Sequence, residues 1–218
     1  MLGLISGLCA GYLVQAGREP TGLPPLSQPR LEQAAGEAPG PLPAARDREV
    51  RTDGDLRRLL LEKPDGAGGA GFAVGGSGWL DLTGLAQSYD EPATAYNWLL
   101  DEEFRRAAMV GWREGGTRTV EIRLLQFRQE EVLGARDEAQ DGSYQNYWAD
   151  VGVWAIPGTG DGKVYIHRKP RDRGGARLYQ AEAHAWRGDI SLQIWMNDTE
   201  PIPKKAIVDL AKRQMERL

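Results

Sequence analysis

Residues 176–196 read ARLYQAEAHAWRGDISLQIWM, and this stretch decides the class of fold that the sequence predicts. Its two arms, residues 176–186 and 190–196, are rich in aromatic and branched residues, and the tight turn Arg187-Gly188-Asp189 separates them. Two such arms joined by a short turn predict an antiparallel β-hairpin. The turn matches an adhesion tripeptide by its letters, but its role in the hairpin is sufficient to explain it.

The segments around this hairpin extend the same pattern. We expect further strands at residues 117–127, 151–156 and 163–168. We expect helices at residues 55–61, 92–109, 129–140 and 203–218. Antiparallel strands with helices segregated to one face or one end indicate an α+β fold. Residues 55–218 therefore predict an antiparallel sheet of about five or six strands with helices packed on it.

Residues 92–109 give the clearest helical pattern of the chain. Pro92 suits the first turn of a helix, and Gly111 lies just past the expected end. Six apolar residues fall on one helical face: Tyr96, Leu99, Leu100, Phe104, Ala107 and Ala108. The last segment, residues 203–218, has a similar apolar stripe and begins with Pro203.

Residues 1–17 open the chain with a largely apolar run. Leu2 to Ala16 contains no charged residue, and as a helix it would span roughly 22 Å, short of the ~30 Å hydrocarbon core of a bilayer. A signal peptide requires basic residues before its apolar run, and no Lys or Arg precedes this one. We expect a membrane anchor or uncleaved signal anchor, with a signal peptide or a core element as alternatives. Translation from upstream of Met1 would explain the short length.

Three glycines within this run, Gly3, Gly7 and Gly11, are spaced four residues apart. In a membrane helix such a ridge of small residues permits close packing of two helices. We therefore name these residues as a candidate packing surface, through which a homo-oligomer would form. The alternative is that glycine is simply frequent in this chain, which has 28 of them.

Residues 18–54 form a proline-rich segment that lacks aromatic residues. Such a composition buries too little apolar surface to offset the entropy lost on ordering. We expect a disordered linker between the anchor at residues 1–17 and a globular domain at residues 55–218.

Composition excludes several classes of function. The net charge of −4 and the pI of about 5.4 do not fit a nucleic-acid-binding protein, which usually presents a concentrated basic face. A single cysteine, Cys9, and two histidines cannot build a thiolate-rich zinc site, and we expect neither a metal nor a cofactor. Gly66, Gly68 and Gly71 match a dinucleotide-binding motif by spacing but lack its strand–turn–helix context, so a loop is expected there.

Candidate binding residues lie in the aromatic stretch SYQNYW and in the strand after it. Tyr144, Tyr147, Trp148 and Trp154 are of the type enriched at binding surfaces, because they supply contact area with few rotatable bonds. The alternative for these rings is packing at the core or its rim. We expect them to line a ligand groove or a partner surface.

No residue is assigned a catalytic role from the sequence. His184 shares a strand face with Glu182, a pair that could act as acid and base, but no nucleophile motif accompanies it. His167 alternates with Val164 and Ile166, which predicts that His167 faces solvent.

The layout of residues 55–218 resembles the extracytoplasmic sensor-like domains of actinobacterial membrane proteins, such as a kinase sensor domain or cell-envelope lipoproteins. Four segments carry the resemblance: DLRRLLL (55–61), AYNWLLDEEFRRAAMVGW (95–112), TVEIRLLQF (119–127) and RQMERL (213–218). The chain contains none of the motifs of a protein kinase. The resemblance implies a sensor or binding part without an effector.

Together these observations predict a single-pass protein of the cell membrane whose globular domain lies outside the cytoplasm. It would bind an unknown envelope ligand or a protein partner and would not be a catalyst. Two alternatives stay open. The first is a cell-envelope hydrolase, in which Glu182 and His184 would be the pair to inspect and a cleft joining two groups of strongly shifted pKa would be expected. The second is a scaffold subunit of a membrane complex.

Overall fold

The computed structural model describes residues 12–13, 16–17, 40, 42–51, 53–70, 78–144, 150–173 and 175–218. The chain divides into two units, Met1–Gly40 and Pro41–Leu218, and the fold described below is that of the second.

The membrane helix expected at residues 1–17 must be corrected. Within the part of the chain that the structure describes, no helix is long and apolar enough to cross a membrane. Tyr12, Leu13 and Ala16 are helical, and the Gly17 amide donates to the Leu13 carbonyl at 3.1 Å. Gly3, Gly7 and Gly11 lie outside the described residues, so their packing stays a prediction.

A nine-stranded antiparallel sheet forms the frame of the second unit. Its main path runs β1-β3-β4-β9-β8-β6-β5, with β2 also paired to β3 and β7 to β8. The strands are β1 (Gly68–Gly69), β2 (Gly78–Leu80), β3 (Phe104–Glu114), β4 (Arg118–Phe127), β5 (Val151–Ala155), β6 (Lys163–His167), β7 (Arg171–Arg173), β8 (Ala176–Arg187) and β9 (Ile190–Asp198). The hairpin predicted from residues 176–196 is confirmed as β8 and β9.

The predicted count of five or six strands is wrong. Three of the additional strands, β1, β2 and β7, are only two or three residues long, too short to show a period in the sequence. A fourth, β3, lies partly inside the segment that was expected to be helical.

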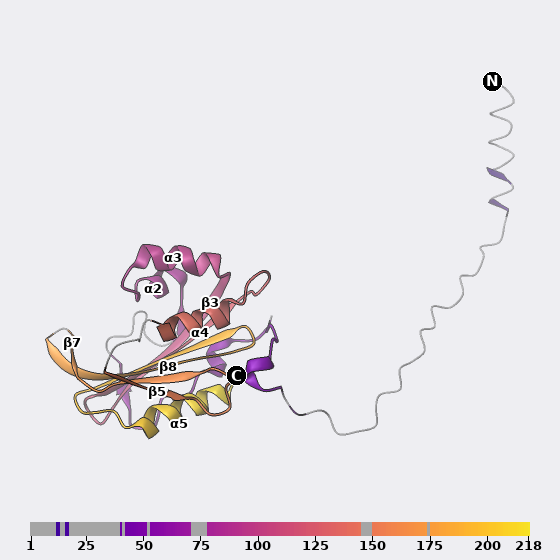
Figure 1. The fold of residues 1–218 in the computed structure, drawn as a ribbon. Helices are drawn as coiled ribbons and strands as arrows, with labels where there is room; N and C mark the ends of the chain where they lie inside the picture. The colour runs from indigo at the N-terminus through magenta and orange to yellow at the C-terminus, as the bar shows by residue number, and fades with distance from the viewer. Residues whose placement is uncertain are drawn as a thin grey trace. The chain divides into compact units, whose positions relative to one another are not determined.

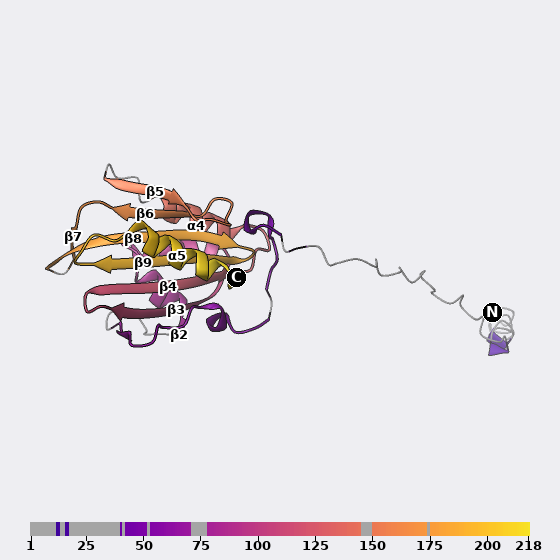
Figure 2. The ribbon, with the colours of Figure 1, turned by 90° about the horizontal axis from the view of Figure 1, so that it is seen from below.

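Helices cover both faces of this sheet. The α-helices are α2 (Leu82–Ala86), α3 (Pro92–Asp101), α4 (Gly134–Tyr144) and α5 (Lys204–Met215), and two short 3-10 helices are η1 (Ala44–Arg46) and η2 (Leu56–Leu59). Figure 1 shows α2, α3 and α4 on one side of the sheet and α5 on the other. Figure 2 views the sheet from the side that carries α5 and shows this helix lying along the central strands.

The α5 side of the sheet is apolar throughout its centre. Alternate residues of β4, Val120, Ile122 and Leu124, point to this side, as their spacing predicts. They join alanines and branched residues of β8 and β9 and the stripe of α5 in one buried cluster. Its α5 members are Ile207, Leu210, Ala211 and Met215. We call this side the α5 face.

The other side is apolar only at one end. There Phe127, Trp186 and Met109 of the sheet pack with Leu85 of α2 and Leu99 of α3 in a second buried cluster. Beyond these residues the same strands carry long polar side chains. We call this side the cleft face.

The helix expected at residues 92–109 ends early. Helix α3 stops at Asp101, and Glu103 takes a left-handed backbone conformation with φ of 60°, which a helix cannot accommodate. Residues 104–114 then form β3 between β2 and β4. Ala107, Ala108 and Met109 are all buried, because this strand is covered on both faces, and such a strand shows no alternating pattern in its sequence.

Helix α4 also lies further along the chain than residues 129–140. Gln129 has φ of 55°, and the backbone amides of Glu130 and Glu131 donate to the Glu103 carboxylate at 2.6 and 3.1 Å. Gly134 begins α4, whereas the helix expected at residues 129–140 would place it in the interior. A Cβ there would lie 2.3 Å from the Glu102 carbonyl oxygen, so the close approach requires glycine.

Residues 42–51 pack on the domain although the sequence places them in a linker. The Gly188 amide donates to the Asp47 carbonyl at 3.2 Å, and the Arg187 side chain pairs with the Asp47 carboxylate at 2.8 Å. Gly188 has φ of 57°, and a Cβ there would lie 2.3 Å from the Glu49 carbonyl oxygen. The Arg187-Gly188-Asp189 tripeptide is thus the hairpin turn that the sequence predicts, and Asp189 is fully buried beneath this segment.

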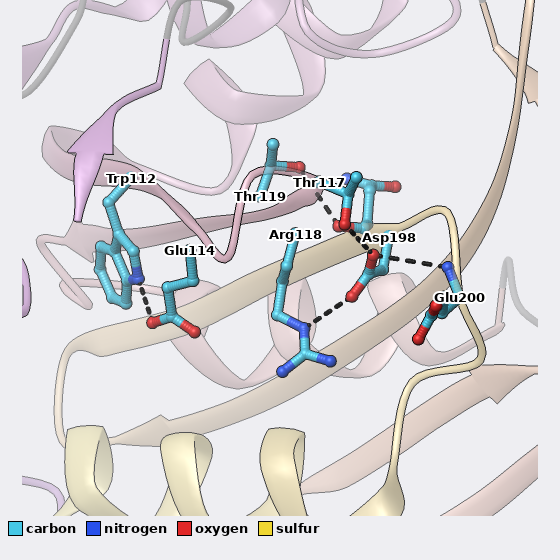
Figure 3. Close-up of polar contacts among 8 residues, drawn as sticks. Trp112, Glu114, Thr117, Arg118, Thr119, Asp198 and Glu200 are labelled. Atoms are coloured by element: carbon cyan, nitrogen blue, oxygen red, sulfur yellow. Dashed lines mark hydrogen bonds and ion pairs between the residues drawn. The ribbon is translucent and has the colours of Figure 1, made fainter.

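A polar network ties the β3–β4 turn to the end of β9 (Figure 3). Thr117 Oγ1 and Arg118 Nε each donate to the Asp198 carboxylate at 2.9 Å, and the Glu200 amide donates to it at 3.4 Å. Trp112, which the same figure shows, is buried within β3, and its indole N–H donates to Glu114 at 2.5 Å. The bonds to Asp198 connect the β3–β4 turn to the end of β9.

Candidate functional site

A cleft of about 670 Å³ opens on the cleft face, between the sheet and the helices that cover it. One wall comes from α3 and the turn before it: Ser88, Tyr89, Asp90, Glu91, Thr94, Ala95 and Trp98. The other wall comes from α4: Glu138, Asp141 and Gly142. The floor comes from the central strands: Arg123, Gln180, Glu182, His184, Gln193 and Trp195, with Arg171 of β7. The volume lies within the range of small-molecule sites in proteins.

Strand alternation explains why the floor is polar. Along β8, Gln180, Glu182 and His184 point into the cleft, whereas the alanines between them point to the α5 face. Because neighbouring strands are in register, Glu182 lies opposite Trp195 and His184 opposite Gln193. Polar residues at alternate positions of three adjacent strands therefore gather in one patch.

Glu138 is the centre of a buried hydrogen-bonded cluster. Its carboxylate accepts from Ser191 Oγ and from Gln193 Nε2, and from the Tyr89 hydroxyl at 3.4 Å. Burial raises the pKa of the Glu138 carboxyl, and this effect outweighs the nearby His184 and the three donors, which lower it. Burial, together with the Glu138 carboxylate, also raises the pKa of the Tyr89 hydroxyl. Glu138 of α4 and Tyr89, in the turn before α3, are both hydrogen-bonded to Gln193 of the floor, and these bonds connect the two walls to the sheet.

The two histidines of the chain flank one carboxylate. His184 Nε2 lies 3.5 Å from one oxygen of Glu182, and His167 Nε2 lies 3.5 Å from the other. The predicted pairing of His184 with Glu182 on one strand face is therefore confirmed. The prediction that His167 faces solvent is wrong: it is 4% exposed, because helices cover this side of the sheet as well.

Arg123 and Trp195 form the third feature of the floor. The guanidinium of Arg123 pairs with Glu121 at 2.5 Å, donates to Ser88 Oγ at 2.6 Å and lies 4.5 Å from the Trp195 ring centre. Trp195 remains half-buried. Its ring also meets the edge of His184, with ring centres 6.1 Å apart. The floor thus presents an aromatic side chain held in place by a fixed cation.

Several buried polar atoms of the floor are unpaired. Among the described residues, the Gln193 Oε1 atom and both ring nitrogens of His184 have no hydrogen-bond partner. Gln193 is 2% exposed and His184 4% exposed, and both line the cleft. A buried polar group without a partner costs about 1–3 kcal/mol, so the Gln193 Oε1 atom is suited to a hydrogen bond with a bound molecule.

The binding residues named from the sequence are only partly placed. Tyr147 and Trp148 lie outside the described residues, and Tyr144 is the last residue of α4. Trp154 is half-buried against the α5 face, with Lys204 Nζ 5.2 Å from its ring centre. Trp154 therefore lies on the opposite side of the sheet from the cleft, and a shared ligand groove for the four residues stays a prediction.

Sequence reasoning missed most of the cleft. Glu138 meets Ser191 and Gln193 across more than fifty positions of sequence, which no local pattern shows. One signal was present: Gln180, Glu182 and His184 alternate with alanines inside a strand of a central hairpin. The same alternation is typical of an antiparallel sheet with one solvated face, so this signal alone does not indicate a cleft.

Across the residues that the structure describes, no three histidine, cysteine, aspartate or glutamate side chains are arranged to hold a metal ion.

Comparisons of the chain with known protein families, with curated proteins and with solved structures give no match. The resemblance to actinobacterial sensor-like domains therefore stays a prediction. Any function must be argued from the cleft itself.

Proposed function

We propose that this domain is a binding domain, and that it takes a small polar molecule in the cleft between α3, α4 and the sheet. One observation carries the proposal: the buried Oε1 atom of Gln193 has no hydrogen-bond partner among the described residues, and Gln193 lines a cleft of about 670 Å³. The half-buried Trp195 beside them offers a surface for an apolar ring or chain. A sensor-like role agrees with this arrangement.

A screen with a matched pair of tryptophan variants tests the proposal. The probe is a library of small polar fragments, and binding is followed by ligand-detected NMR with the wild-type domain. In Trp195→Ala we expect most fragment signals to be lost, because the floor of the cleft loses its aromatic side chain. Trp79 is 44% exposed, is not among the residues that line the cleft, and has Arg57 and Arg106 over its ring. Trp79→Ala should therefore retain the fragment signals.

Two outcomes would contradict the binding proposal. One is a screen in which no fragment binds the wild-type domain. The other is a set of bound fragments that Trp195→Ala and Trp79→Ala affect equally. Circular dichroism of both variants separates the loss of binding from the loss of folding.

A hydrolase is the second candidate, because the cleft joins two groups of shifted pKa, Glu138 and Tyr89. Against it, the Glu138 oxygens already accept from Ser191, Gln193 and Tyr89. Chromogenic ester and glycoside substrates test this candidate. Turnover by the wild type that Glu138→Gln abolishes would favour the hydrolase over the binding domain.

The location expected from residues 1–54, at the cell membrane with the domain outside the cytoplasm, stays a prediction. Protease added to intact cells that make the native protein tests it. Protection of the domain until the cells are lysed would contradict an extracytoplasmic location.

A further inference from the structure

Acidic residues outnumber basic residues in the lining of the cleft, and this excess indicates the class of ligand. Five lining carboxylates face the space, against two lining arginines. The carboxylates are Asp90, Glu91, Glu138, Asp141 and Glu182, and the arginines are Arg123 and Arg171. An acidic lining of this kind disfavours an anion and attracts a cation.

Arg123 does little to reduce this imbalance. Its guanidinium contacts the carboxylate of Glu121 at 2.5 Å, and Glu121 is additional to the five lining carboxylates. The positive charge of Arg123 is therefore compensated from outside the lining, and Arg171 is the other lining arginine.

The acidic groups on α4 lie in an environment that disfavours their charge. Burial, together with the neighbouring Asp137 carboxylate, raises the pKa of Asp141. Burial also raises the pKa of Glu138, one helical turn earlier. A positive charge placed beside Asp141 would lower the pKa of the Asp141 and Glu138 carboxyls, because it interacts favourably with their ionised forms.

The neutral groups of the floor suit the same kind of ligand. Gln193 is 2% exposed, and its Oε1 atom, an acceptor, has no partner among the described residues. An ammonium or guanidinium group carries several N–H donors and could supply that bond. Trp195 adds an aromatic ring of the kind over which organic cations bind, as Arg123 already does at 4.5 Å.

We propose that the cleft binds an organic cation, a small molecule that carries an ammonium or guanidinium group. The charged group lies towards the carboxylates of Asp141 and Glu182, and the rest of the molecule lies against Trp195. This inference rests on the proposed binding function and narrows it to one class of ligand.

Three probes of similar size that differ in the charge of one terminal group test the class of ligand. Tyramine, tyrosol and 4-hydroxyphenylacetate share one aromatic ring and carry an ammonium, a hydroxyl and a carboxylate group. Binding is followed by ¹H–¹⁵N NMR at the Trp195 indole and the Gln193 side-chain amide, up to about 10 mM of each probe, since a fragment of this size binds weakly. We expect saturable shifts with tyramine, an affinity lower by about tenfold for tyrosol, and the weakest binding for the carboxylate.

A matched pair of variants tests the place of the charge. Asp141→Asn removes one lining carboxylate and should lower the affinity for tyramine by about fivefold while leaving that for tyrosol unchanged. Asp209→Asn makes the same change on the outer surface of α5, where Asp209 pairs with Lys205, and should change neither affinity.

The outcomes distinguish this inference from the proposed function. If tyrosol or 4-hydroxyphenylacetate shifts the cleft signals at least as strongly as tyramine, the cation inference is overturned and the binding function stands. If Asp141→Asn and Asp209→Asn affect tyramine equally, the charge is not read in the cleft and the inference falls. If none of the three probes shifts the Trp195 or Gln193 signals, the cation inference is overturned, and the fragment screen described above decides the binding function separately.

Discussion

The two faces of the sheet are made by the same strands and have opposite characters. On β8 the alanines at 181, 183 and 185 point to the α5 face, whereas Gln180, Glu182 and His184 point to the cleft. The small alanines allow α5 to pack closely on the sheet. On the cleft face the side chains are long and polar, and together with α3 and α4 they line a cleft, so one face supplies stability and the other a site.

The difference lies in what burial costs on each face. Apolar burial on the α5 face stabilises the fold by roughly 25 cal/mol per Å². Burial on the cleft face removes water from Glu138 and Gln193, and each then needs a partner within the protein or a ligand. A change on the α5 face should therefore alter stability, and a change on the cleft face should alter binding and the response to pH.

The largest expected effect comes from Ile122→Ala. Ile122 is fully buried in the centre of the α5 face, and its truncation leaves a cavity between the sheet and α5. We expect the free energy of unfolding to fall by about 2–5 kcal/mol, measured by urea denaturation with an unchanged m value. Leu100→Ala, at a residue of α3 that is 50% exposed, should cost less than about 1 kcal/mol. Equal costs for the two variants would mean that the α5 face is not the main core.

A smaller effect is expected from Gly142→Ala, which changes the wall of the cleft. A Cβ at this position would lie 2.4 Å from His184 Nδ1 and 2.6 Å from Cε1 of the same ring. The ring is buried and meets the rings of Tyr165 and Trp195, so it cannot move without a cost. We expect destabilisation of about 1–3 kcal/mol, reduced by up to about 1 kcal/mol through the better helix propensity of alanine.

The control for this variant is Gly69→Ala. A Cβ at Gly69 would meet no atom within 4 Å, and the change should alter the free energy of unfolding by less than about 0.5 kcal/mol. Fragment binding should be reduced in Gly142→Ala and unchanged in Gly69→Ala. If Gly142→Ala is neutral for both stability and binding, the His184 ring is not fixed and the cleft floor is less ordered than its contacts indicate.

The α5 face could be predicted from the sequence, because its signal is local. Val120, Ile122 and Leu124 show the strand period directly, and the stripe of α5 shows the helical period. The hairpin of β8 and β9 followed from the composition of its two arms and the turn between them. Each of these elements is recognised from fewer than twenty-five consecutive residues.

The cleft face could not be predicted, because its determinants are not local. Strand β3 is covered on both sides, so its buried residues Ala107, Ala108 and Met109 show no strand period, and the sequence predicts helix there. The start of α4 depends on Gly134 fitting beneath the Glu102 carbonyl, which no propensity encodes. That start sets which acidic residues of α4 reach the sheet, and with them the walls of the cleft.

The smallest expected effect is a change in how stability depends on pH, and it separates the cleft from the network at Asp198. Burial raises the native pKa of Glu138, so its favourable contribution is full below the ordinary carboxyl pKa and is lost as the pH rises through the raised value. For Asp198, burial raises the pKa, but hydrogen bonds from Thr117, the Glu200 amide and Arg118 outweigh burial and lower it. Its contribution is therefore present above the ordinary carboxyl pKa and is lost as the pH falls through the lowered value.

Glu138→Gln and Asp198→Asn should consequently shift the pH profile of stability in opposite directions. Urea denaturation from below the ordinary carboxyl pKa up to neutral pH should show Glu138→Gln gaining stability relative to the wild type as the pH rises. Asp198→Asn should lose stability relative to the wild type across the more acidic range as the pH rises. A constant offset between variant and wild type reflects only altered hydrogen bonds, because those do not titrate, so the slope is the decisive quantity. Parallel slopes for Glu138→Gln and the wild type would mean that the cleft holds Glu138 in a solvated environment, and the contrast between the two faces would lose its electrostatic basis.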